Sequence, residues 1–435
     1  MALRRGAALM RVKVYHPSPC SPSRGIIPAD ATAGFPNMPP FPAFSITALP
    51  RIVFGDGRIA DLPREVAALG RTALLVTGAH SFRAGPYRAP LMAGFAEAGV
   101  AVETWEVAGE PTPDLVDDAV GRFRSAGIQA VVGIGGGSAI DAAKAVAGLL
   151  PTGASIMDFL EGVGRGKTYA GPALPLVAVP TTAGTGAEAT KNAVLSRTGA
   201  NGFKKSFRDD RLMPRLALID PALLATCPRP VMAANAMDAL TQLIESYVSI
   251  RANPMTDALA LAGIEAVRDG LWPAIEGAGA AAREGRARLA FAALMSGICL
   301  AQTGLGAVHG MAAPLGAAFG VPHGAACGTL LAETTLANIE ALMERDPLGP
   351  ALPRYGRIGG LLAGQARVCG GDGLIVLSDV LDDWAERLDM PRLSVFGMTE
   401  ADIPAVVAAS GGNSMKTNPL VLTAEELTDI LKRRL

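Results

Sequence analysis

Short apolar runs alternate with amphipathic stretches over the first half of the chain. The runs are rich in β-branched residues, are bounded by glycine and proline, and have the length of strands, whereas the stretches between them repeat their apolar positions at helical spacing. Such an alternation predicts a parallel, doubly wound sheet. The expected strands cover residues 46–55, 72–78, 100–107, 130–134 and 174–179, and the expected helices include 113–126 and 138–150.

The pattern changes beyond about residue 233, where successive Ala- and Leu-rich segments are apolar most of the way round. Helices of this kind pack inside a bundle rather than on a surface. We therefore predict an α/β N-terminal Rossmann-like domain followed by an all-α helical C-terminal domain, with a small-molecule cleft between them. The expected domains cover residues 45–228 and 229–435.

Residues 1–44 do not fit either domain, because they are basic, contain no acid before Asp30 and include a proline-rich stretch. We interpret them as a disordered tail or an over-extended gene start with the initiator at Met38. A basic, acid-poor start also resembles an organellar transit peptide, so a targeting role stays open.

The overall charge argues for small-molecule partners. Thirty-nine basic and forty acidic residues leave a net charge of −1, so no global field attracts nucleic acid or an anionic membrane. Residues 289–332 contain no Asp, Glu, Lys or Arg, but polar side chains, two prolines and eight glycines interrupt them, so we expect core helices rather than a membrane span. The five cysteines include no C-x-x-C pair, which favours a reducing, cytoplasmic location without a structural zinc site.

Two glycine-rich segments follow predicted strands and suggest an anion site. The strand at 130–134 runs into residues 135–144 (GGGSAIDAAK), where three glycines can take positive φ and the following helix, starting near Ser138, presents free N–H groups. A plain tight turn would look similar, because the segment is not the G-x-G-x-x-G fingerprint. Residues 180–190 (PTTAGTGAEAT) then add threonine hydroxyls that could contact a second face of a phosphate or sugar.

A candidate metal site lies in the second half. His309 and His323 fall in the charge-free stretch, and Asp238 lies on an apolar helix with Gln242 four residues later on the same face. Two histidines and a carboxylate suit non-haem Fe²⁺, and zinc accepts the same donors. The alternative is a pair of satisfied core histidines. We interpret the other two histidines, His16 and His80, as structural or solvated.

These segments together resemble the ordered motifs of iron-containing, group III alcohol dehydrogenases. The resemblance covers the chain from about residue 45 and adds residues 237–249 (MDALTQLIESYVS) and 304–324 (GLGAVHGMAAPLGAAFGVPHG) to the two glycine-rich segments. It implies NAD or NADP in the N-terminal domain, Fe²⁺ or Zn²⁺ in the cleft, and a homodimer.

Carried over by position, the resemblance places metal ligands at Asp238, His309 and His323, with the two histidines acting in catalysis through the metal. The third histidine of the family pattern is replaced by Gln242, a weaker neutral oxygen donor, so occupancy of the site is in question. A further histidine near the nicotinamide is replaced by Ala313, so we place this chain in a subgroup that lacks both residues.

The same matching implies the contacts of the cofactor. Many NAD-preferring members carry an acid after the second strand, where this chain has Gly78, so NADP should be tolerated or preferred. The implied cofactor contacts are Gly78, Gly136, Gly137, Ser138, Asp141, Thr181, Thr182, Thr185 and Lys204.

The leading hypothesis is an NAD(P)-dependent alcohol dehydrogenase or aldehyde reductase that uses a divalent metal. A metal-independent oxidoreductase resembling maleylacetate reductases, or a degenerate nucleotide-binding relative without turnover, stays open because of Gln242 and Ala313. We expect an apolar substrate cavity among Leu240, Gln302, Ala313 and Phe319 and a neutral alcohol or aldehyde as substrate, because no arginine lies at the motif positions to clamp a carboxylate.

Overall fold

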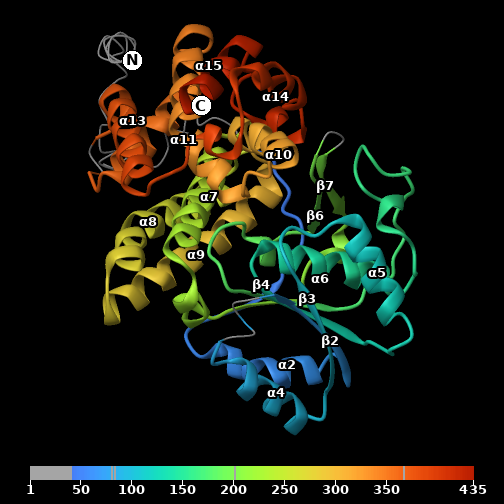
Figure 1. The fold of residues 1–435 in the computed structure, drawn as a ribbon. Helices are drawn as coiled ribbons and strands as arrows, with labels where there is room; N and C mark the ends of the chain where they lie inside the picture. The colour runs from blue at the N-terminus through green and yellow to red at the C-terminus, as the bar shows by residue number, and fades with distance from the viewer. Residues whose placement is uncertain (1–41, 80–81, 83–84, 200–201, 366–367) are drawn as a thin grey trace, which may run out of the picture.

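The computed structural model describes residues 42–79, 82, 85–199, 202–365 and 368–435 (Figure 1). Most of the predicted tail, together with His16 and His80, lies outside these residues. The described chain consists of an α/β part followed by a mostly helical part, so the predicted fold class is confirmed.

A six-stranded, fully parallel sheet forms the centre of the α/β part, with the strand order β1-β8-β5-β4-β2-β3. Its central strands are buried on both faces, which explains why they appear in the sequence as continuous apolar runs. The strands are β1 (Arg51–Phe54), β2 (Thr72–Gly78), β3 (Ala101–Val107), β4 (Ala130–Gly135), β5 (Leu176–Pro180) and β8 (Leu216–Ile219).

Alternate residues of each strand face two separate cores, as the period of two requires. Leu74 and Val76 of β2 pack under α5 (Pro113–Phe123) and α6 (Gly137–Leu149). Ala73 and Leu75 face the opposite core, which α2 (Leu62–Ala67) and α4 (Arg88–Glu97) cover (Figure 1). The α/β layering therefore buries both faces of the sheet.

The sheet reverses its strand order between β2 and β4, since β3 lies on one side of β2 and β4 and β5 follow on the other. Ligands of open α/β sheets bind at such a switch point, outside the carboxyl ends of the strands. Gly78 ends β2 and Gly135 ends β4, so both lie at this position.

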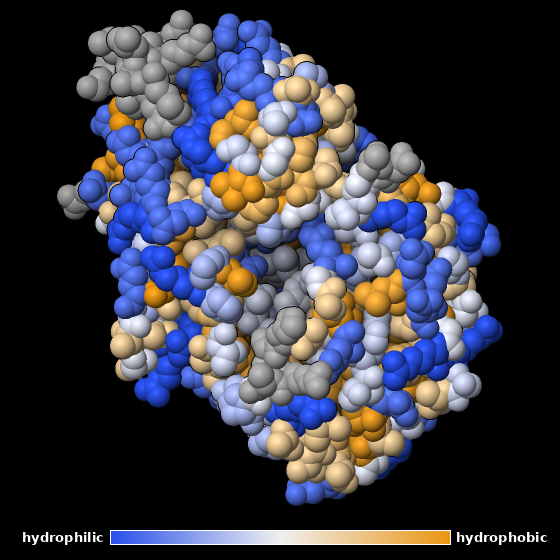
Figure 2. Space-filling view, in the orientation of Figure 1, coloured by the Kyte–Doolittle hydropathy of each residue, from blue (hydrophilic) through white to orange (hydrophobic). Residues whose placement is uncertain are grey.

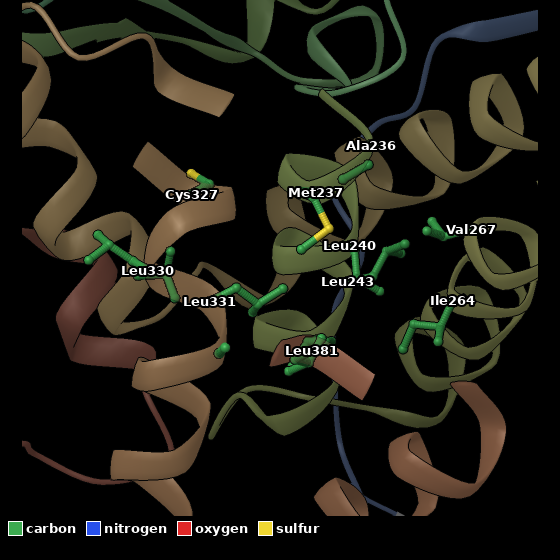
Figure 3. Close-up of a cluster of buried hydrophobic side chains, with 14 of the residues drawn as sticks. Ala236, Met237, Leu240, Leu243, Ile264, Val267, Cys327, Leu330, Leu331 and Leu381 are labelled. Atoms are coloured by element: carbon green, nitrogen blue, oxygen red, sulfur yellow. The ribbon is translucent and has the colours of Figure 1, made fainter. Parts of the chain in front are cut away.

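The helical part is built around a large apolar core (Figure 3), to which α7, α8, α11 and α13 all contribute. Within the described residues, no single helix has both the length and the apolar composition needed to cross a bilayer, and α9 and α10 meet these criteria only when taken together, across a bend of 101°. The helices are α7 (Arg229–Val248), α8 (Pro254–Glu276), α9 (Gly279–Thr303), α10 (Ala307–Phe319), α11 (His323–Arg345), α12 (Ala351–Leu362), α13 (Gly370–Arg387), α14 (Ile403–Ala409) and α15 (Ala424–Arg434).

Close contacts of several kinds join the α/β part to the helical part. Gly186, at a φ of 60°, lies so close to Gly297 of α9 that a Cβ on Gly297 would be 2.2 Å from the carbonyl oxygen of Gly186. Thr47 donates its backbone N–H to Oε1 of Gln302 at 2.8 Å, although it precedes the first strand. An antiparallel hairpin, β6 (Asn192–Arg197) and β7 (Phe203–Arg208), lies beside α10.

Candidate active site

A cavity of about 1490 Å³ lies between the α/β part and the helical part. Figure 2 shows the molecule hollowed between these parts. The cavity brings together most of the predicted site residues from both parts. Those that line it are Gly136, Gly137, Ser138, Asp141, Thr182, Thr185, Lys204, Gln242, His309 and His323.

The glycine-rich turn after β4 forms one wall of the cavity, but its glycines do not have positive φ as we expected. Gly136 is extended at a φ of −74°, and α6 begins at Gly137, one residue before Ser138. The glycines are required by close packing, because a Cβ on Gly137 would be 2.8 Å from Oγ1 of Thr185 and one on Gly136 3.3 Å from Oγ1 of Thr182. The first turn of α6 therefore opens directly onto the threonine loop, as a phosphate site requires.

Asp141 and Lys204 both line this half of the cavity, and each has a partner of opposite charge. Asp141 lies 3.6 Å from the buried Lys144, whose Nζ also donates to Oγ1 of Thr190 at 2.8 Å. Burial raises the pKa of Asp141 to about 6 despite this neighbour. Lys204 forms an ion pair with Glu110, which also accepts a hydrogen bond from Ser196. A ligand that needs Lys204 has to compete with Glu110 for it.

Two of the predicted cofactor residues do not line the cavity. Thr181 is buried and donates its backbone N–H to the carbonyl oxygen of Gly135 at 2.9 Å, so it joins the two loops rather than facing a ligand. Gly78 lies beside Gly135 at the switch point, and a Cβ added to it would meet no heavy atom within 4 Å of the described residues.

A cluster of metal-type donor atoms forms the opposite wall. Asp238 is fully buried in the middle of α7, and its Oδ1 lies 3.4 Å from Nε2 of His309 and 3.7 Å from Nε2 of His323. The two histidines lie in the first turns of α10 and α11. The structure thus brings both predicted histidines to the carboxylate of Asp238, and the side chain of Gln242 also contacts this carboxylate.

Glu245 positions His309, a role that the sequence reasoning missed. Its Oε2 accepts a hydrogen bond from Nδ1 of His309 at 2.6 Å, which leaves Nε2 free to face Asp238. Its Oε1 accepts the backbone N–H of Val308 at 2.8 Å, and Gly306 gives the carboxylate room to reach this helix end. Glu245 lies seven residues after Asp238 on the same helical face, which was the available signal.

Gln242 does not present the oxygen donor that we expected. Its Oε1 accepts a hydrogen bond from Oγ of Ser296 at 2.9 Å, and its Nε2 donates to Oδ1 of Asp238 at 3.2 Å. An amide N–H has no lone pair to give to a cation. Gln242 thus lies beside Asp238, but its oxygen is hydrogen-bonded to Ser296.

Cys327 also belongs to the cluster, although the sequence reasoning overlooked it. Its Sγ lies 3.6 Å from Nε2 of His309 and 4.0 Å from Nε2 of His323, and one donor atom from each of Asp238, His309, His323 and Cys327 lies within 4.8 Å of every other. The signal was its position four residues after His323, on the same face of α11.

The protonation states of the cluster depend on one another, and burial lowers the pKa of His309 less than Glu245 and the hydrogen bond to Asp238 raise it. Burial alone would raise the pKa of Asp238, but His323 and the hydrogen bond from His309 hold it at about 2. Burial lowers the pKa of His323 to about 4, so this imidazole is neutral, and burial raises the pKa of the Cys327 thiol to about 12. Asp238 and His323 are in the forms that bind metal, whereas His309 and Cys327 each have to release a proton when a metal binds.

One observation tests directly whether these residues fit a metal ion. Oδ2 of Asp238 and Nδ1 of His323 are buried, and neither has a hydrogen-bond partner among the described residues. A buried carboxylate oxygen without a partner is costly, and a bound cation relieves that cost. The donor types and the unpartnered oxygen together fit a divalent metal.

The predicted substrate cavity is only partly right. Ala313 lines the cavity, whereas Leu240 is fully buried in the helical core. Gln302 is engaged by Thr47, and neither it nor Phe319 is among the residues that line the cavity.

A doubly wound sheet with a phosphate-type turn, joined to a helical part with a metal-type cluster, is the architecture of an enzyme that binds a nucleotide and a metal. The chain belongs to the iron-containing alcohol dehydrogenase family. Residues 50–221 match the family "Iron-containing alcohol dehydrogenase", and residues 232–435 match "Fe-containing alcohol dehydrogenase family, C-terminal".

Individual relatives agree with this assignment. The chain is 33% identical over 387 residues to alcohol dehydrogenase 4 of Schizosaccharomyces pombe, covering 87% of this chain and 86% of the relative. It is 34% identical over 297 residues to 1,3-propanediol dehydrogenase of Citrobacter freundii, covering 67% and 74%. A solved 1,3-propanediol oxidoreductase matches with a TM-score of 0.81 at 27% identity, covering 91% of this chain and all of that one.

A sulfoacetaldehyde reductase from Bifidobacterium kashiwanohense, solved in complex with NAD⁺, matches with a TM-score of 0.75 at 26% identity, over 90% of this chain and 99% of that one. The chain is therefore an oxidoreductase acting on alcohols or aldehydes. Its family implies NAD(P) and a divalent metal such as iron.

Proposed function

We propose that the chain transfers hydride between NAD(P) and a small neutral alcohol or aldehyde at a divalent metal. Residues 45–228 would bind the cofactor, and residues 229–435 would bind the metal and substrate. The observation that carries the proposal is the cluster of Asp238, His309 and His323, whose two histidines line the same cavity as the turn after β4. A homodimer and a cytoplasmic location stay predictions.

Each half of the cavity has its own task in this proposal. The first turn of α6, with Ser138, and the loop with Thr182 and Thr185 would hold the pyrophosphate and ribose. Asp238, His309 and His323 would hold the cation, and Glu245 fixes the ring of His309. When bound, the cation would polarise the alcohol or carbonyl oxygen and the nicotinamide would exchange the hydride.

The side chains also decide how a proton can leave. Ala313 has no titratable group, so the proton of an alcohol would pass to water, to a cofactor hydroxyl or to another side chain that lines the cavity.

The proposal is tested by measuring metal content and NAD(P)H-dependent reduction of short aldehydes on the same preparation. We expect about one divalent metal per chain, loss of turnover with a chelator, and recovery on adding Fe²⁺ or Zn²⁺. Turnover that a chelator leaves unchanged would favour the second candidate, a metal-independent reductase, which the N–H of Gln242 facing Asp238 supports. Cofactor binding without turnover under every condition would indicate a degenerate relative.

We expect Gly78→Asp to shift cofactor preference from NADP towards NAD by about 10- to 100-fold in kcat/KM, because a carboxylate there can bind the ribose 2′-hydroxyl and repels a 2′-phosphate. The added side chain has room, since no described atom lies within 4 Å of its Cβ. The measurement is kcat/KM with each cofactor. The neutral Gly78→Asn is the matched control and should shift the ratio much less; equal shifts would contradict the electrostatic reason.

We expect Glu245→Gln to weaken metal binding about 10- to 100-fold, the usual cost of losing a carboxylate behind a metal-binding histidine. Glu245 accepts from two donors, Nδ1 of His309 and the N–H of Val308. Glutamine has only one acceptor oxygen, so its amide NH₂ would face one of these two N–H groups. Competition titration with a chromophoric chelator measures the change. Asp257→Asn, which removes a remote ion pair with Arg354, should leave metal affinity unchanged.

A further inference from the structure

The donor cluster contains one metal-type side chain, Cys327, that the sequence motifs did not predict. Because Gln242 occupies the position where the family pattern has a histidine, the cluster would otherwise offer three protein ligands. We propose that Cys327 is the fourth protein ligand of the metal, bound as a thiolate, and that Gln242 is not a ligand. This inference rests on the proposed function, since it concerns the metal of that same site.

The hydrogen bonds of Gln242 are the first step of the argument. Its oxygen accepts from Ser296 of α9 while its nitrogen donates to Asp238. Turning the amide over would place its oxygen against the carboxylate of Asp238, whereas the hydroxyl of Ser296, which also lies 2.8 Å from the carbonyl oxygen of Ala293, can either donate or accept. In the orientation of the structure, the amide N–H, which cannot bind a cation, faces the cluster.

The position of Cys327 is the second step. It lies one turn after His323 on α11, fully buried, with its Sγ 3.6 Å and 4.0 Å from the Nε2 atoms of the two histidines. Figure 3 shows it on α11 in the apolar cluster that includes Met237 of α7. A core thiol usually has only apolar neighbours, whereas this one faces both imidazoles and the carboxylate of Asp238, whose Oδ2 has no partner among the described residues.

Charge balance is the third step. Glu245 lies behind His309 and faces its Nδ1, so among the four donor side chains of the cluster only Asp238 and a Cys327 thiolate can bring negative charge to the cation. One carboxylate and one thiolate supply two negative charges, and the thiol proton leaves to solvent when the metal binds. Thiolate and imidazole donors favour zinc and iron over magnesium, calcium and manganese.

The test uses the full-length protein, stripped of metal with a chelator and titrated with Co²⁺. A thiolate bound to Co²⁺ gives a near-ultraviolet charge-transfer band that nitrogen and oxygen ligands do not give. We expect this band at one equivalent of Co²⁺ in the wild type, its loss in Cys327→Ser, and a fall in Co²⁺ and Zn²⁺ affinity of about 100-fold or more, because even indirect partners of a ligand are worth about 10- to 100-fold.

Two matched variants separate this inference from trivial effects. Cys299→Ser removes another fully buried free thiol, on α9, and should keep both the band and the affinity. Gln242→Ala should keep the band, and its affinity should fall by no more than about 10- to 100-fold, the cost of losing a side chain that only hydrogen-bonds a ligand.

The outcomes separate the inference from the proposed function. Stoichiometric Co²⁺ binding without the band in the wild type would overturn the role of Cys327 while leaving the metal-dependent function intact. Retention of the band in Cys327→Ser would also overturn it. Failure to bind any metal, with turnover indifferent to chelator, would overturn both. The wild-type spectrum decides even where a variant does not fold.

Discussion

Asp238→Asn is expected to lower kcat/KM by about 1000-fold or more and to leave the purified protein with little metal. The carboxylate is fully buried and lies between both histidines, and the nearby Glu245 is already engaged by Nδ1 of His309 and the N–H of Val308. A Lewis-acid cation is worth several kcal/mol of transition-state stabilisation, and about 4 kcal/mol corresponds to three powers of ten in rate. Steady-state kinetics and elemental analysis of the same sample measure both effects.

The control for Asp238→Asn is Asp220→Asn, which changes another fully buried aspartate. Asp220 accepts the backbone N–H groups of Gly57, Ile59 and Ala222, so its variant should lose stability but keep its metal. Metal content and kcat/KM close to wild type in Asp238→Asn would contradict the proposed site.

Gly297→Ala is expected to lower the free energy of unfolding by about 1–3 kcal/mol and to weaken NAD(P)H binding. The new Cβ would lie 2.2 Å from the carbonyl oxygen of Gly186, a backbone atom that cannot turn aside. The threonine loop must then move away from α9, and this loop also faces the turn after β4. Chemical denaturation and a fluorescence titration with NADPH measure the two effects.

Gly121→Ala is the matched control, because Gly121 lies within α5 and an added Cβ there meets no described atom within 4 Å. Alanine in an open helical position stabilises by about 0.5–1 kcal/mol. We therefore expect Gly297→Ala to lose stability and Gly121→Ala to gain a little. A Gly297→Ala protein as stable as wild type would show that the two parts are not held by this contact.

The sequence predicted the layers of the fold because they depend on local periodicity. The central strands are apolar on both faces, and the helices after residue 229 are apolar nearly all round, so both parts could be assigned without distant contacts. The edge strand β1 is shorter than expected, at Arg51–Phe54, because only these residues pair with β8. Pairing partners of an edge strand are not visible in the local pattern.

The sequence predicted which residues form the site better than it predicted the contacts that orient their side chains. Asp238, His309 and His323 converge as the motifs suggested. The amide orientation of Gln242 depends on Ser296, which is 54 residues away on another helix, so no spacing rule could reveal it. Cys327 was overlooked for a different reason: its spacing from His323 was visible, but a single cysteine without a C-x-x-C partner looked like an ordinary core residue.

The unpartnered Oδ2 of Asp238 also affects how long the protein would last in a cell. A metal that binds only the folded chain stabilises it by RT ln(1 + [metal]/Kd), whereas the empty chain retains the full penalty of the buried oxygen. Molecules without their cation would visit open states more often and so be degraded sooner. Under the proposed function, the supply of metal would set how many copies of this enzyme survive as well as how many are active.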